Sequence, residues 1–294
     1  MDHYKSRKWI VVFLLPLVIM FFLFFILPLG FVFIVSLTKW GGFGKMEFVF
    51  LDNYRYLFQN GTFRIAIRNN FIWAFSLGFV QITLATVVAM ILSRKPLMWK
   101  FLRTIYFLPN VISQVAIAMM WIAIYNAEYG ALNRLLELAG LSRFATNWLG
   151  TIETALPAVI LQQVLYIGYF MIIILAGRMT VPDSLYEAAD LDGASVLQQE
   201  LYITIPMLKD ILITSMTLAM AFGLRHFEST FLMTAGGPAN STQVMGIMLY
   251  NNLHSLTYGR ANAIGSILII LGFFVIVLIR RVFGSSSFTT EIRQ

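Results

Sequence analysis

The chain has 294 residues, of which 59% are hydrophobic and 12% charged, and its formal net charge is +7. A soluble domain has about 25% charged and about 45–50% apolar residues, so this composition excludes an ordinary soluble protein and predicts a membrane protein. The chain has no cysteine, which excludes disulfides, thiolate zinc sites and a cysteine nucleophile.

Long apolar stretches predict six transmembrane helices, and they lie at 10–37, 71–92, 104–125, 154–177, 211–233 and 261–279. All but the first have close to the ~17–25 residues that a spanning helix needs. The first is longer, so we expect it to tilt or to project beyond the bilayer, with bends at Pro16 and Pro28. Lys5, Arg7 and Lys8 precede it as in a secretory signal. The run is too long for such a signal and no small-residue cleavage site follows, so we expect a retained first span.

The basic residues predict the orientation. With six spans both termini share a side, which carries 12 of the 21 Lys and Arg residues, whereas the other side carries eight. The short connection RKPLMWKFLR at 94–103 contributes most to this bias. Because cytoplasmic loops are enriched in Lys and Arg, both termini are expected in the cytoplasm. The net charge therefore requires no nucleic acid as a partner, since basic residues hold topology against an anionic leaflet.

Polar and aromatic residues interrupt the third and fourth spans. They are Asn110, Gln114, Trp121, Gln162, Gln163, Tyr166 and Tyr169. Aromatic faces with a few placed polar groups are typical of ligand pockets, so these residues are candidates for the lining of a pathway through the membrane. The alternative is helix packing, because polar side chains also join helices in lipid.

An external segment joins these two spans. Residues 126–150 are expected to form an amphipathic helix that lies at the membrane interface. The residues that indicate it are Asn133, Leu135, Leu136, Leu138, Leu141 and Trp148.

The loop after the fourth span, residues 178–210, is expected to be cytoplasmic. Its stretch 186–210 holds five of the fourteen carboxylates. Ser184, followed three residues later by Glu187, predicts a capping box that opens a short helix. Gly193 is expected to take a positive φ between this helix and a second one. Pro206 then closes the unit before the next span.

The second helix of this loop is predicted over ASVLQQELYI. Its apolar residues Val196, Leu197, Leu201 and Tyr202 recur at roughly helical spacing. We therefore expect a helix–turn–helix with an acidic and an apolar face, which suits a docking surface.

The fifth span carries ionisable residues in MAFGLRHFESTF, namely Arg225, His226 and Glu228. A centred Arg, Lys or Asp costs about 2.5–3.5 kcal/mol on insertion scales, so such residues indicate function, and Arg225 and Glu228 are further candidates for the pathway. The alternative is that Arg225 and Glu228 pair at i, i+3 and anchor the end of the span. After this span, GGPANST at 236–242 predicts a turn-rich external loop.

Several motifs resemble a known family. Glu187-Ala188-Ala189, then Gly193, then Ile203-Thr204-Ile205-Pro206 resemble the EAA loop of binding-protein-dependent ABC importer permeases. The chain departs from that pattern at Ile205, where the family usually has Leu, and at Asp210, where many members have Pro. FVFLDNYRYLF at 48–58, FLRTIYFLPNVIS at 101–113, LAGRMTVPDSLYEAADLDGA at 175–194 and LMTAGGPANST at 232–242 are similar to the first permease of carbohydrate uptake systems, the maltose type.

The resemblance implies an all-α polytopic membrane protein, with six transmembrane helices and a cytoplasmic helix–turn–helix coupling loop. It implies three parts: a first transmembrane helix with an external loop (1–69), a permease core that contains the EAA loop 178–210 (70–281), and a cytoplasmic tail (282–294). The coupling residues that it implies are Glu187, Ala188, Ala189, Asp190, Asp192, Gly193 and Pro206.

The resemblance also implies partners. These are a second permease, two ABC ATPase subunits and an extracytoplasmic sugar-binding protein, in a bacterial cell membrane that this multi-pass chain crosses. The chain is then not an enzyme and binds no cofactor, because ATP and Mg are used by the ATPase subunits. GGFGK at 41–45 does not have the phosphate-binding spacing G-x-x-x-x-G-K-[ST].

Other functions fit the sequence to different degrees. An importer permease for a polyol phosphate or another organic solute fits similar motifs. A stand-alone secondary carrier would need carboxylates near mid-bilayer and repeat symmetry, and the sequence shows neither. The histidines His3, His226 and His254 lie too far apart for an H-E-x-x-H metal helix, and no G-x-S-x-G is present.

Overall fold

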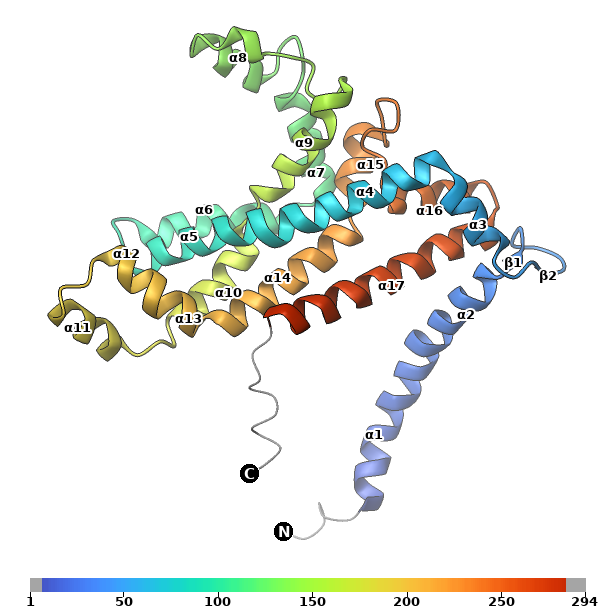
Figure 1. Cartoon of the computed structure of the whole chain (residues 1–294), viewed down its shortest axis with the longest axis horizontal. Coiled ribbons are helices and arrows are strands. Elements are labelled where there is room, and N and C mark those ends of the chain that lie inside the picture. Colours follow the sequence, from blue (N-terminus) through green and yellow to red (C-terminus); the bar gives the residue numbers. More distant parts are fainter. Residues whose placement is uncertain (1–6, 284–294) are drawn as a thin grey trace. The chain divides into compact units, whose positions relative to one another are not determined.

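A computed structural model describes residues 7–283, and helices make up most of this part of the chain (Figure 1). Lys5, His3 and the predicted tail from residue 284 onward lie outside the described residues. The remaining predictions can be compared with the structure.

Three continuous helices are long and apolar enough to cross a membrane. The first joins α1 (Arg7–Phe21), the π-helix η2 (Phe22–Ile26) and α2 (Leu27–Ser36). The second joins α4 (Gly61–Phe75), the π-helix η3 (Ser76–Gln81) and α5 (Ile82–Ser93). The third is α17 (Tyr258–Phe283).

Three bent pairs of helices pass the same test of length and composition together. The first pair joins α6 (Trp99–Phe107) and the 3₁₀ turn η4 (Leu108–Val111) to α7 (Gln114–Ile124), with a bend of 103°. The second joins α9 (Ile152–Val164) to α10 (Gly168–Arg178) at 41°. The third joins α12 (Val196–Gln199), η6 (Glu200–Thr204) and α13 (Ile205–Met207) to α14 (Lys209–Leu224) at 73°. With each pair counted as one span the described chain has up to six spans, which confirms the predicted all-α polytopic fold class.

Three predicted spans are not continuous, and one of them, the stretch 154–177, breaks between α9 and α10. The stretch 104–125 breaks at Ile112 and Ser113, where Ser113 is extended and its side chain accepts a hydrogen bond from the N–H of Ala116. The stretch 211–233 breaks between α14 and α15 (Glu228–Thr234). There the side chain of the buried Asn70 donates a hydrogen bond to the carbonyl of Leu224. Its Oδ1 accepts a second hydrogen bond, of 2.8 Å, from the N–H of Met245. A side chain from another helix therefore takes over backbone groups at the fifth-span break.

The described chain divides into two compact units, and each has its own contacts. The first unit comprises residues up to Gly61 and Met248–Ile269. It contains the antiparallel pair β1 (Thr38–Lys39) and β2 (Glu47–Phe48), and α3 (Asp52–Gln59). The hydroxyl of Tyr54 on α3 lies 2.7 Å from Ser36 Oγ and 2.8 Å from Ser266 Oγ. The residues of α3 thus join the end of the first span to α17.

The second unit comprises Thr62–Ile247 and the residues from Ile270 onward. Its core packs α10 along α5, α14 against η3, and α15 against α7. Large side chains fill it, among them Trp73, Met171 and Ile174, which are almost fully buried. The shorter helices α8 (Ala131–Leu138) and α11 (Asp183–Leu191) are well separated within this unit (Figure 1), and α16 (Met245–His254) precedes α17. The division of the chain into three parts at residues 69 and 281 stays a prediction.

The backbones of α14 and α4 approach closely at Gly223. A Cβ atom at this position would lie 2.6 Å from Cα of Ala74 and 2.7 Å from its nitrogen. Small residues permit such approaches between membrane helices, and overpacking costs typically about 1–3 kcal/mol. We therefore expect Gly223→Val to lower the thermal stability of the detergent-solubilised protein and its abundance in membranes. Gly272→Val is the matched control, because a Cβ at Gly272 on α17 meets nothing within 4 Å; equal stability of the two variants would contradict the close approach.

Candidate functional site

A cavity of about 580 Å³ lies within the second unit. Seven residues predicted for the pathway line it: Asn110, Gln114, Gln163, Tyr166, Tyr169, Arg225 and Glu228. Six further residues also line it: Leu77, Gln81, Phe170, Phe222, His226 and Phe227. The structure therefore brings together side chains from the second, third, fourth and fifth predicted spans.

The helix breaks build this cavity. Its lining residues flank the break before α7, the break at 165–167 between α9 and α10, and the break at 225–227 between α14 and α15. Within a membrane, irregular backbone is tolerated only where protein covers it or where it lines a cavity. Gln81 satisfies the second break, since its Nε2 donates to the carbonyls of Gln163 at 2.9 Å and Tyr166 at 3.0 Å. A side chain of the second span thus provides hydrogen bonds to the backbone carbonyls at the break in the fourth span.

Three lining residues present buried polar atoms without a hydrogen-bond partner in the described part of the chain. These atoms are Oε1 of Gln114, Oε1 of Gln163 and Nε2 of His226. An unsatisfied buried polar group costs about 1–3 kcal/mol. All three side chains line the cavity, so its wall contains amide and imidazole groups whose hydrogen-bonding capacity is not fully used by the described residues.

Aromatic rings complete the cavity. The indole N–H of Trp121 donates to the hydroxyl of Tyr166 at 2.8 Å and fixes that ring. The rings of Trp73 and His226 stack with centroids 3.7 Å apart. Tyr169 lies beside Phe222, with ring centroids 6.5 Å apart. Aromatic rings of Tyr166, Tyr169 and Phe222 therefore line the cavity together with the polar side chains, while Trp73 and Trp121 support the lining from outside it.

Arg225 and Glu228 do not pair. Between residues 7 and 283, ion pairs join Arg94 to Glu200 and Arg134 to Glu137, and none joins Arg225 to Glu228. The guanidinium of Arg225 instead lies 4.8 Å from the ring centre of Phe222. The alternative of an anchoring pair at i, i+3 is therefore wrong, and both charges are exposed at the cavity.

Two of the predicted polar residues lie elsewhere. Trp121 supports Tyr166 from outside the lining, where it packs against the hydrophobic core. Gln162 is fully buried, away from the lining, and neither of its amide atoms has a hydrogen-bond partner in the described residues. Helical spacing explains the difference from Gln163, because adjacent residues on a helix point about 100° apart.

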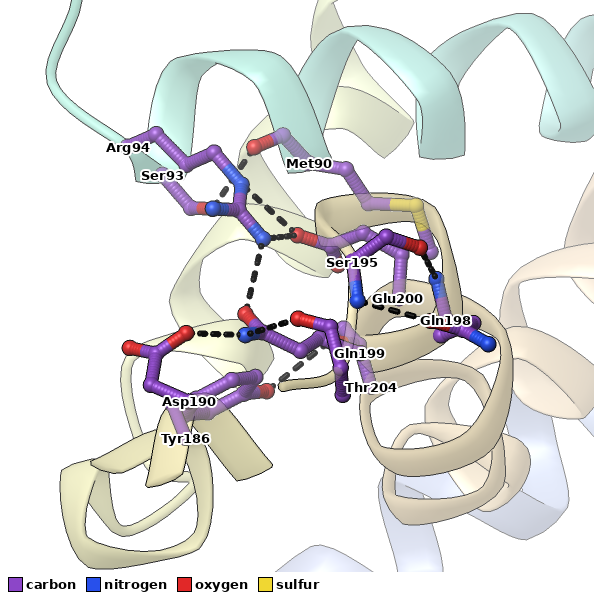
Figure 2. A network of polar contacts seen from close by, with 11 residues as sticks. Met90, Ser93, Arg94, Tyr186, Asp190, Ser195, Gln198, Gln199, Glu200 and Thr204 are labelled. Carbon is purple, nitrogen blue, oxygen red and sulfur yellow. Dashed lines mark hydrogen bonds and ion pairs between the residues drawn. The ribbon is translucent and has the colours of Figure 1, made fainter. Parts of the chain in front are cut away.

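The loop 178–210, termed the coupling loop below, forms the predicted helix–turn–helix (Figure 2). Gly193 has a φ of 74° and ends α11. The hydroxyl of Tyr186 lies 2.8 Å from Thr204 Oγ1, and Nε2 of Gln199 donates to Oδ1 of Asp190. These contacts hold α11 against the second helix.

The capping box lies at a different place from the predicted one. Pro182 is the N-cap of α11, without a side-chain hydrogen bond, so Ser184 is already inside the helix and cannot cap it. A capping box is formed instead by Ser195 and Gln198 at the start of α12. The prediction for Ser184 and Glu187 was therefore wrong, because Pro182 is the N-cap and the helix begins at Asp183, two residues earlier than a Ser184 cap would allow.

The predicted coupling residues lie on the surface of the chain. Glu187, Ala188, Asp190, Asp192, Gly193 and Pro206 are exposed, and Ala189 is half-buried. On the second helix the apolar Val196, Leu197, Leu201 and Tyr202 are exposed. Its polar residues Gln199, Glu200 and Thr204 are buried. The apolar face thus points outward, and exposed apolar patches of this kind mark contacts with another protein or with the membrane.

The segment 126–150 folds around Asn133. Its Nδ2 donates to the carbonyls of Ala127 and Thr146, and its Oδ1 accepts from the N–H of Thr146 and from Trp148 Nε1 at 2.7 Å. Helix α8 exposes the apolar Leu135 and Leu138. The predicted amphipathic helix is therefore present over Ala131–Leu138.

The loop between α15 and α16 contains the predicted turn-rich stretch 236–242. Nδ2 of Asn69 donates to the carbonyls of Ser241 and Gln243, both at 2.8 Å. The hydroxyl of Thr242 donates to the carbonyl of Gly237 at 2.8 Å. Side chains of α4 and of the loop itself therefore fix its shape.

Some lining residues carried no usable signal in the sequence. Phe170, Phe222 and Phe227 are apolar residues within apolar helices, so nothing separates them from core residues. Gln81 was detectable, because it is a polar residue inside the second apolar stretch. Its role depends on the carbonyls of another span, which periodicity does not show.

Known proteins share this fold. A permease chain of a bacterial alginate ABC transporter, solved in complex with an alginate pentasaccharide-bound periplasmic protein, matches with a TM-score of 0.80 at 23% identity, over 94% of each chain. At that identity the likeness shows the fold. It agrees with the architecture built above.

Sequence relatives give the family. The probable ABC transporter permease protein YurN of Bacillus subtilis (strain 168) is 34% identical over 264 residues, which is 88% of this chain and 90% of the relative. The trehalose/maltose transport system permease protein MalF of Thermococcus litoralis is 32% identical over 283 residues, 94% of each chain. The family described as "Binding-protein-dependent transport system inner membrane component" matches residues 81–285. The resemblance to importer permeases is thereby confirmed, and this chain belongs to the family of inner membrane components of binding-protein-dependent transport systems.

Proposed function

We propose that this chain is the permease subunit of an ATP-driven importer for a sugar or oligosaccharide. It forms the translocation pathway with a second permease, and the cavity provides its share of that pathway. Two ATPase subunits bind and hydrolyse ATP with Mg, and this chain carries no ATPase site of its own. An extracytoplasmic sugar-binding protein delivers the substrate.

The observation that supports the substrate class is the chemistry of the cavity. Its volume of about 580 Å³ falls within the ~300–1,000 Å³ of ligand pockets. The amide groups of Gln114 and Gln163, which line the cavity, would hydrogen-bond hydroxyl groups of a sugar, and the apolar face of its ring would pack on aromatic side chains. The names of relatives for trehalose, maltose and multiple sugars agree with this chemistry.

The exposed coupling loop supports the ATPase contact. Its acidic first helix and its outward apolar second helix leave a surface that the chain itself does not cover. In the proposed complex this surface sits in a cleft of an ATPase subunit, and closure of the ATPases moves it. The residues of this contact are Glu187, Ala188, Ala189, Asp190, Asp192, Gly193 and Pro206.

Reconstitution tests the proposal. The chain, its partner permease, the ATPase and the binding protein are placed together in proteoliposomes, and uptake of radiolabelled oligosaccharides is measured with and without ATP. We expect uptake only with ATP and with the binding protein present. Uptake by this chain alone, driven by an ion gradient, would show a secondary carrier instead, and uptake of a polyol phosphate but no sugar would refute the substrate class.

The orientation is tested by cysteine labelling, since the chain has no cysteine of its own. Gln198 on the coupling loop and Asn240 after α15 are both exposed. With both termini in the cytoplasm, an impermeant maleimide should label Gln198→Cys only from the cytoplasmic side and Asn240→Cys only from outside. Labelling of both positions from one side would contradict this orientation.

A further inference from the structure

We propose that helix α5, termed the rod below, transmits movement of the coupling loop to the cavity, with Arg94 as the positioning residue at the loop end. This inference rests on the proposed function, in which the ATPase moves the coupling loop. It adds a route by which that movement reaches the substrate.

The loop end of the rod is an ion pair. Arg94 follows the last residue of α5, and both its Nε at 3.0 Å and its Nη2 at 2.8 Å donate to Oε1 of Glu200 (Figure 2). Glu200 is only 7% exposed. A buried carboxylate with two charged hydrogen bonds has a fixed direction, because its desolvation is repaid only in good geometry.

The same arginine contacts the second helix of the loop directly and the first helix through Gln199. Its Nη2 lies 3.4 Å from Oε1 of Gln199, whose Nε2 donates to Asp190 on α11 and to the carbonyl of Ala194. A chain of polar contacts therefore runs from the exposed first helix to the end of α5 (Figure 2). Movement of either helix changes the position of Arg94.

The polar contacts face inward, although the same helix has apolar residues available. Gln199 is 4% exposed, whereas Leu197 is 68% exposed and Leu201 48%. Ordinary stabilisation would bury the leucines, since apolar burial stabilises more than a buried ion pair does. The buried Gln199 and Glu200 therefore specify where the loop lies against α5, while the leucines remain available for a partner.

The cavity end of the rod is Gln81, the residue directly before α5. Its Nε2 holds the carbonyls of Gln163 and Tyr166 at the break between α9 and α10. Helix α5 has 12 residues, which corresponds to about 18 Å at ~1.5 Å per residue. One short helix therefore carries the loop contact at one end and the contact to two cavity-lining residues at the other.

Two covalent routes also leave the loop, through α10 and through α13 into α14. A test must separate the rod from these routes and from plain stability. The ratio of sugar transported to ATP hydrolysed does so, because loss of folding lowers both quantities together and leaves their ratio unchanged.

The experiment uses the complete complex in proteoliposomes, with ATP hydrolysis and sugar uptake measured in the same vesicles. The variants are Arg94→Gln and Glu200→Gln, and Arg134→Gln is the matched control because it breaks the exposed pair of Arg134 with Glu137 on α8. We expect normal ATPase copurification in all three. The sugar transported per ATP should fall at least fivefold in Arg94→Gln and Glu200→Gln and stay at the parental value in Arg134→Gln.

Rescue gives the second measurement. The exchange Arg94→Glu with Glu200→Arg restores opposite charges across the contact and is expected to recover at least half of the parental ratio. Any of four results would overturn the rod. They are a parental ratio in both single variants, a proportional fall of hydrolysis and uptake, loss of ATPase copurification, and no recovery in the exchanged pair. If the parent complex itself shows no ATP-driven uptake, the proposed function has failed. If the parent transports and the variants keep its ratio, only the rod has failed.

Discussion

Gly193→Asp is expected to abolish ATPase copurification and sugar uptake while the chain remains in the membrane. Gly193 has a φ of 74°, and a Cβ there meets nothing within 4 Å of the chain itself. The side chain therefore has room in the isolated subunit, apart from strain of about 1–2 kcal/mol for the left-handed backbone. In the complex, its carboxylate would be pressed into the ATPase contact, and an unpaired buried charge costs several kcal/mol. Since ~1.4 kcal/mol is a tenfold change in an equilibrium constant, association should fail.

Gly140→Asp is a close structural control for this prediction. Gly140 has a φ of 71° and also open space around its Cβ position. Both glycines follow a helix and form the same pair of backbone hydrogen bonds. The N–H groups of Gly140 and Leu141 donate to the carbonyls of Glu137 and Leu136, and those of Gly193 and Ala194 donate to the carbonyls of Asp190 and Ala189. The two variants therefore carry equal backbone strain.

The measurements are ATPase copurification, sugar uptake and membrane abundance. Normal copurification and uptake in Gly193→Asp at normal abundance would show that this loop is not the ATPase contact. Equal loss of copurification in Gly140→Asp would assign the effect to strain. Glu187→Ala is expected to be milder than Gly193→Asp, because the exposed Glu187 forms no capping box and loses only its charged contact with the partner.

Gln163→Met is expected to lower sugar uptake about tenfold while the complex stays assembled. The side chain lines the cavity, and its Oε1 is buried without a partner among the described residues. Loss of an amide hydrogen bond to a sugar hydroxyl costs about 1–3 kcal/mol when the hydroxyl is left unpaired. The backbone carbonyl that Gln81 holds is unchanged by this substitution, so the helix break should persist. Glu228→Ala should impair uptake in the same way, because its carboxylate lies at the same cavity.

Gln162→Met is the control, one residue away on the same helix. Gln162 is fully buried outside the cavity lining, with both amide atoms unpartnered in the described residues. Replacing such an amide by an apolar side chain of similar length is neutral or stabilising. Uptake should therefore equal the parental rate. Parental uptake in Gln163→Met and Glu228→Ala, or an equal loss in Gln162→Met, would mean that the cavity is not the pathway.

The position of the site was partly predictable. Asn110, Gln114 and Gln163 stood out because polar residues are rare in apolar spans, and the structure places all three at the cavity. Trp121 and Gln162 shared that signal but serve packing or are buried elsewhere. Residue type shows that a side chain is unusual in lipid, whereas its direction depends on how each helix is rotated against its neighbours.

The sequence by itself determined the membrane class, the apolar spans, the helix–turn–helix of the coupling loop and the positive φ of Gly193. These follow from composition and local chemistry, because hydrophobic length and backbone freedom act over a few residues. Only the tertiary structure decided where the fifth span breaks, that Gln81 holds the carbonyls of the fourth span, and that Arg94 pairs with Glu200. Those outcomes depend on hydrogen bonds between residues 82 to 154 positions apart, which no local pattern encodes.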